Sequence, residues 1–117
     1  MKHHKRGRTL GKSNTQRAAL LKSLSRSLVL HGKIKTTEAK AKELRPMIEK
    51  LITHAREDSV ANRRLVASRL GGDEEATDKL FKAIAPRYTE RPGGYTRIIK
   101  RAATASDGRK TAYIAFV

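Results

Sequence analysis

The residues that most resemble a chemical motif lie near the start of the chain, in the run GRTLGKS of residues 7–13. A phosphate-binding loop places four residues between its two glycines, ends in Lys followed by Ser or Thr, and follows a buried strand. Here three residues separate Gly7 from Gly11, and the preceding residues are Lys5 and Arg6. The run is therefore interpreted as part of a flexible basic arm, and nucleotide hydrolysis is not expected.

Histidines and carboxylates do not form a catalytic or metal-binding pattern. His3 and His4 are adjacent but lack a nearby third ligand, so they either contact RNA or are simply solvated. Ten of the eleven acids fall in residues 38–90, mostly at helix starts or four residues from Lys or Arg. No histidine stands beside a recognisable nucleophile and orienting acid. We therefore expect no enzyme activity, no cofactor, no metal and no small-molecule substrate.

The chain is strongly basic, and its charge is concentrated at the two ends. It has 27 Lys and Arg against 11 acids, a formal net charge of +16. Residues 1–37 contain ten of these cations and no acid, residues 38–90 are nearly neutral, and residues 91–117 contain one acid. The ten cations are Lys2, Lys5, Arg6, Arg8, Lys12, Arg17, Lys22, Arg26, Lys33 and Lys35. A solvated surface normally mixes both signs, so this segregation predicts nucleic-acid binding.

A second candidate site lies in the run RYTERPGGYTR of residues 87–97. Its arginines, Arg87, Arg91 and Arg97, surround a Pro-Gly-Gly turn, where Gly93 and Gly94 allow close approach of the backbone to a phosphate. Two interpretations of its tyrosines remain open. Tyr88 and Tyr95 either stack on unpaired bases or pack beneath the loop.

The elements that position these residues follow from capping signals and periodicity. Residues 1–12 have no apolar periodicity and predict a flexible arm, while residues 13–117 predict one compact domain. Ser13 and Gln16 predict a capping box for a first helix that ends at Gly32. A short strand, three more helices, the last stopped by Pro86, and two strands follow. The fold class is thus α+β in the order α-β-α-α-α-β-β, a two-layer arrangement of helices on a three-stranded sheet.

Location and alternative functions are also constrained. There is no cysteine and no apolar run of membrane-spanning length, so a cytoplasmic protein without membrane partners is expected. The alternative to an RNA-binding protein is a DNA-binding nucleoid or regulatory protein. It is disfavoured because no helix-turn-helix or dimer pattern is evident, and no homo-oligomer is expected.

Three segments carry a resemblance to a known family: HHKRGRTLGKSNTQRAALLKSL, IKTTEAKAKELRP and LFKAIAPRYTERPGGYTRIIKR. Through them the chain resembles the bacterial large-subunit ribosomal protein seventeen family. The resemblance implies binding to large-subunit ribosomal RNA near the nascent-peptide exit region, beside large-subunit protein thirty-two. It implies RNA contact by His3, Arg6, Arg8, Arg17, Arg87, Tyr88, Gly93, Gly94, Tyr95 and Arg97. The charge pattern adds Lys2, His4, Lys5, Lys12, Lys22, Arg26 and Arg91 to these candidates.

Overall fold

The computed structural model describes residues 13–101 and 110–117, so the predicted arm of residues 1–12 lies outside the described residues. The predicted α+β class and order of elements are confirmed. The helices and strands, in chain order, are α1 (Asn14–His31), β1 (Lys33–Thr37), α2 (Glu38–Ala55), α3 (Val60–Arg69), α4 (Glu74–Lys79), β2 (Thr96–Lys100) and β3 (Thr111–Phe116).

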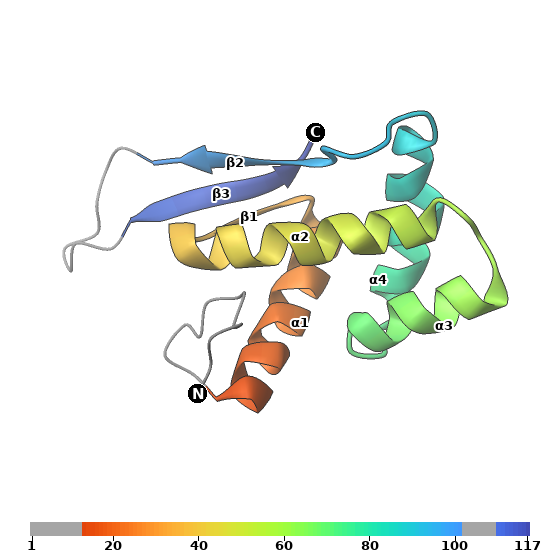
Figure 1. The fold of residues 1–117 in the computed structure, drawn as a ribbon, viewed down its shortest axis with the longest axis horizontal. Helices are drawn as coiled ribbons and strands as arrows, with labels where there is room; N and C mark the ends of the chain where they lie inside the picture. Colours follow the sequence, from red (N-terminus) through yellow and green to blue (C-terminus); the bar gives the residue numbers. More distant parts are fainter. Residues whose placement is uncertain (1–12, 102–109) are drawn as a thin grey trace, which may run out of the picture.

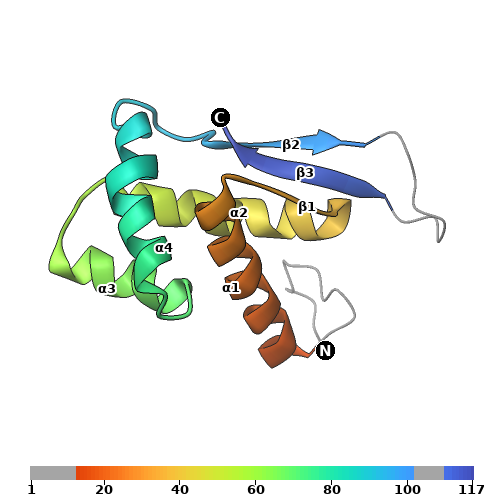
Figure 2. The same cartoon turned by 180° about the vertical axis from the view of Figure 1, so that it is seen from behind.

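Helix α2 runs through the middle of the molecule and contacts most of the other elements. The sheet lies along its first half, while α3 and α4 lie together near its C-terminal end (Figure 1). Helix α1 crosses α2, and the reverse view shows α4 beside α1 on the far side (Figure 2).

The ends of α1 follow directly from local sequence. The Ser13 hydroxyl accepts a hydrogen bond from the Gln16 amide, and the Gln16 side chain accepts one from the Ser13 amide. This is the predicted capping box, which satisfies amides that no helical carbonyl can reach. At the other end Gly32 has φ of 79°, a left-handed conformation that terminates the helix.

The three strands form one antiparallel sheet in the order β1-β3-β2. Ile34 of β1 and Ile98 of β2 both pair with Ile114 of β3, so the predicted three-stranded sheet is confirmed. Side chains alternate between the two faces of a sheet. Ala112 and Ile114 are buried on the inner face, against α2.

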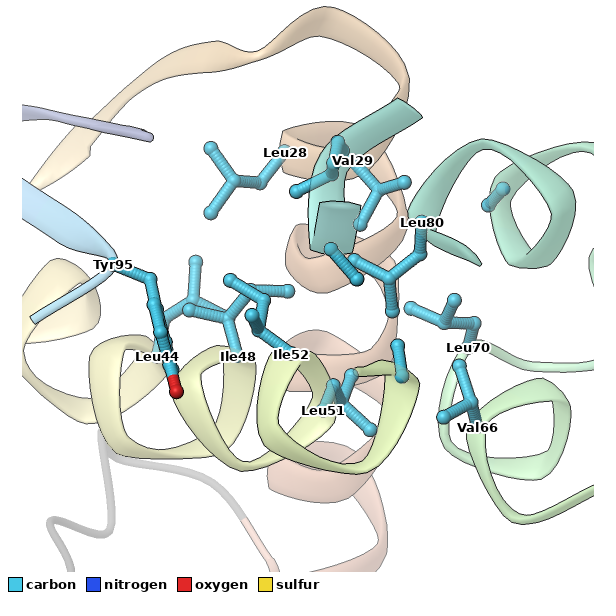
Figure 3. Packing of buried hydrophobic residues seen from close by; sticks show 14 of the residues in the cluster. Leu28, Val29, Leu44, Ile48, Leu51, Ile52, Val66, Leu70, Leu80 and Tyr95 are labelled. Atoms are coloured by element: carbon cyan, nitrogen blue, oxygen red, sulfur yellow. The ribbon is translucent and has the colours of Figure 1, made fainter. Parts of the chain in front are cut away.

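The core joins the inner face of the sheet to all four helices. Leu44, Ile48 and Ile52 from α2 are fully buried and meet Leu28 of α1 (Figure 3). Val66 and Leu70 extend the cluster to α3, and Leu80 extends it to the segment after α4.

The end of the fourth helix differs from the sequence prediction, because the chain continues past Pro86 in modified helical form. A π-helical turn spans Leu80–Ile84, and a 3-10 turn spans Ala85–Tyr88. In the π-helical turn the Ala85 amide donates to the Leu80 carbonyl, five residues earlier in the chain. Pro86 lies near the start of the 3-10 turn, where a backbone amide would have no carbonyl of that turn to bond. The absence of an amide hydrogen in proline therefore costs that turn no hydrogen bond.

Candidate nucleic-acid interface

The loop before β2 is held in place by one carboxylate of α2. Glu49 accepts hydrogen bonds from the Gly94 amide at 3.2 Å, from the Thr96 amide at 3.4 Å and from the Thr96 hydroxyl at 2.8 Å. Arg45, one turn earlier in α2, lies 3.4 Å from the same side chain. Burial alone raises the pKa of Glu49, but these hydrogen bonds outweigh it and lower the pKa below its ordinary value.

Two glycines give the loop its shape. Gly93 has φ of 150° and Gly94 has φ of 66°, conformations that residues with a side chain rarely adopt. A Cβ added at either position meets no atom within 4 Å. The glycines are therefore required by backbone conformation, and the space beside them is open to a ligand.

The two tyrosines pack beneath the loop, the second of the two interpretations offered by the sequence. Tyr88 is 3% exposed and Tyr95 is 1% exposed, and their ring centroids lie 5.1 Å apart. The Tyr88 hydroxyl donates to the Val117 carbonyl at 2.7 Å. Figure 3 shows Tyr95 reaching toward α2 beside Leu44 and Ile48. Buried rings cannot stack on bases, so the RNA contact expected of these two side chains does not fit this conformation.

Arg56 was not a candidate in the sequence, yet it organises the same region. Its guanidinium donates to the Tyr95 hydroxyl at 3.0 Å and to the Thr89 carbonyl at 2.7 Å. Arg56 lies in the nearly neutral middle of the chain, where nothing in the local sequence distinguishes it from other solvated cations. Glu49 lies in the same nearly neutral middle, where nothing in the local sequence distinguishes it from the other acids.

The three arginines of the loop point outward. Arg87, Arg91 and Arg97 are all exposed, and none has an acidic partner within the described ranges. The fold thus separates the predicted site into buried tyrosines that support the loop and exposed arginines that can meet a ligand.

The cations of α1 differ in how available they are. Lys22 and Arg26 are exposed, although Arg26 lies 3.8 Å from Asp73. Arg17 forms an ion pair with Glu43 of α2 and is three-quarters buried at its side chain. Its charge is therefore already neutralised within the protein, unlike that of Lys22. The other candidates, at positions 2–12, lie outside the described residues.

The chain matches the family described as Ribosomal protein L17 over residues 20–117, which includes the whole 87–97 loop. It belongs to that family. Members of the L17 family are structural constituents of the large ribosomal subunit, which is a cytoplasmic particle. There they are assembled with ribosomal RNA and other large-subunit proteins. The family resemblance noted in the sequence is thereby confirmed.

Within residues 13–101 and 110–117, no helix of this L17 family member combines the length and apolar character needed to cross a bilayer.

Proposed function

We propose that the chain serves the large subunit by binding ribosomal RNA and neutralising its phosphates, with no chemistry of its own. The observation that carries this proposal is the acid-free opening of 37 residues with ten Lys and Arg. In the described part of this segment Lys22, Lys33 and Lys35 are exposed, so their charges face outward. Cations that displace counterions from phosphates supply most of the sequence-independent affinity for nucleic acid.

The loop of residues 87–97 supplies a second contact in this proposal. Arg87, Arg91 and Arg97 bind phosphates, and the backbone at Gly93 and Gly94 lies close to the RNA. The hydrogen bonds to Glu49 support this role, because they fix the loop before RNA arrives. A loop that is already ordered loses less conformational entropy on binding.

The opening residues complete the proposed contact surface. Lys2, His3, His4, Lys5, Arg6, Arg8 and Lys12 contribute to RNA binding, together with Lys22 and Arg26 of α1. The family resemblance supports a location near the nascent-peptide exit region, with large-subunit protein thirty-two as a neighbour. Cross-linking within intact subunits tests both parts of that location.

The deciding experiment compares RNA with DNA. Purified protein is titrated with fragments of large-subunit ribosomal RNA and with duplex DNA of equal length, at the same salt concentration. Tighter binding to one RNA fragment than to all DNA is expected. In cell lysate the protein should sediment with large subunits and be released by RNase but not by DNase. Release by DNase, or equal affinity for DNA, would instead support the nucleoid alternative.

A further inference from the structure

The sheet has a second face that the helices do not cover. We define the outer sheet face by the residues that alternate with the buried ones, in three cross-strand rows given by the pairing register. The first row is Lys33, Ala115 and Arg97, the second is Lys35, Tyr113 and Ile99, and the third is Thr37, Thr111 and Arg101. None of these nine residues is buried.

The outer sheet face is uniformly cationic. Lys33, Lys35, Arg97 and Arg101 are exposed, and the face contains no Asp or Glu. Its cations come from both basic ends of the chain, because β1 belongs to the opening segment and β2 to the closing one. Only the antiparallel pairing of both strands with β3 brings these two charge clusters together.

Tyr113 lies at the centre of this face and holds two of the cations. The Lys33 ammonium lies 4.4 Å from its ring centroid, and the Arg101 guanidinium carbon lies 5.5 Å from it. Lys33 lies on β1 and Arg101 directly follows β2, so each is a diagonal neighbour of Tyr113, two residues from the residue that pairs with it. Cation–π contact positions a charge without neutralising it, because the ring carries none. Lys33 and Arg101 thus keep their charge, unlike Arg17, which forms an ion pair with Glu43.

Ile99 adds an apolar surface beside the ring. Ile99 is 44% exposed, and it pairs directly with Tyr113. A face with an aromatic and an aliphatic centre and cations around it matches the chemistry of a nucleotide, whose base and sugar lie between phosphates. A protein interface also has an apolar centre, but its composition is depleted in lysine, whereas two of the four cations on this face are exposed lysines, as expected for a phosphate ligand.

We propose that the outer sheet face binds a short unpaired segment of RNA. Lys33, Lys35, Arg97 and Arg101 contact its phosphates, while Ile99 and Tyr113 contact a base or sugar. A five-residue strand is about 17 Å long, which suits the two or three bases that a sheet face typically holds. Tyr113 acts as a positioning residue for Lys33 and Arg101. This inference rests on the proposed function, since it presupposes that ribosomal RNA is the ligand.

The test removes two charges from the sheet and compares this change with the loss of two charges elsewhere. The variant is K33Q/R101Q, and the matched control is R64Q/K82Q, which removes one Arg and one Lys that are exposed on the helical side. Each protein is titrated with the large-subunit RNA fragment that binds the wild type best, at several salt concentrations. We expect K33Q/R101Q to bind RNA about tenfold more weakly than the wild type, whereas the control should bind less than twofold more weakly. The slope of log affinity against log salt concentration should become shallower by about two for K33Q/R101Q.

A third variant, Y113L, separates positioning from folding. It retains an apolar side chain and all charges but loses the ring, so RNA binding should weaken several-fold while the folded protein keeps its circular dichroism spectrum. If K33Q/R101Q and its control bind RNA equally, the sheet inference is wrong while the proposed function stands. If K33Q/R101Q binds RNA normally but fails to enter large subunits, the face takes a protein, and the inference is again overturned. Failure of the wild type to prefer RNA would remove both proposals.

Discussion

The Thr96 hydroxyl donates a 2.8 Å hydrogen bond to the Glu49 carboxylate across a separation of 47 residues. It joins the middle of α2 to the first residue of β2. The same carboxylate also accepts from the Gly94 amide, so a single side chain fixes both the glycine turn and the start of the strand. The exposed arginines on either side of the turn therefore project from a backbone that the core defines.

The Glu49→Gln variant should lose stability at neutral pH, by about 1–3 kcal/mol. Glutamine keeps only one acceptor oxygen, so its NH2 group would face either the Gly94 amide or the amide and hydroxyl of Thr96, all of which donate to Glu49. Because the pKa of Glu49 is lowered in the folded state, its contribution is complete above its ordinary value of 4.5 and disappears as the pH falls through the folded pKa. Denaturant unfolding of both proteins from pH 7 to pH 3 measures this. A stability difference that does not shrink at low pH would contradict it.

Replacing Arg97 by Ala should weaken RNA binding by about 1–3 kcal/mol, as expected for loss of a hydrogen bond to a charged group. Because Arg97 is exposed, the free energy of unfolding should change by less than about 0.5 kcal/mol. Binding titrations and thermal melting of the same preparation check both statements. Normal RNA binding by the variant would remove Arg97 from the interface.

Replacing Tyr95 by Ala should have the opposite profile. The ring is fully buried and its hydroxyl accepts a hydrogen bond from Arg56, so the variant should lose about 3–5 kcal/mol of stability. Tyr95→Phe keeps the ring and should lose only about 0.5–1.5 kcal/mol. Protein that remains folded at low temperature should bind RNA nearly as well as the wild type. Unchanged melting with weakened binding would show that the ring meets RNA after all.

Gly94→Ala tests whether backbone conformation alone requires the glycine. With φ of 66° and open space around the position, the substitution should cost about 1–2 kcal/mol of stability from strain and nothing from collision. Gly94→Asn, which tolerates the left-handed conformation better, should recover part of this cost. Equal melting temperatures for the alanine variant and the wild type would mean that the turn rearranges easily.

Salt should weaken RNA binding steeply. If the contacts displace on the order of six to ten counterions, affinity should fall roughly a thousandfold or more between 50 and 200 mM salt. Affinity measured at four or five salt concentrations gives the slope directly. A flat response would show that buried apolar area, rather than charge, drives association.

The sequence by itself determined the features that depend on neighbours along the chain. The capping box at Ser13, the left-handed end at Gly32 and the alternation in β1 need only a few consecutive residues, because caps and side-chain periodicity are local. The order of elements and the segregation of charge follow in the same way. For these reasons local patterns are sufficient to predict the fold class, while the segregation of charge supports the proposal that the chain binds nucleic acid.

Tertiary structure decided which of the candidate residues are available to a ligand. Tyr88 and Tyr95 belong to the core, and Arg17 is paired with Glu43, which lies 26 residues away. The outer sheet face exists only because β3 aligns β1 with β2 in one register. Burial and cross-strand pairing depend on the packing of segments that are far apart in the sequence. No local pattern therefore specifies whether an isolated tyrosine or arginine faces the core or the solvent.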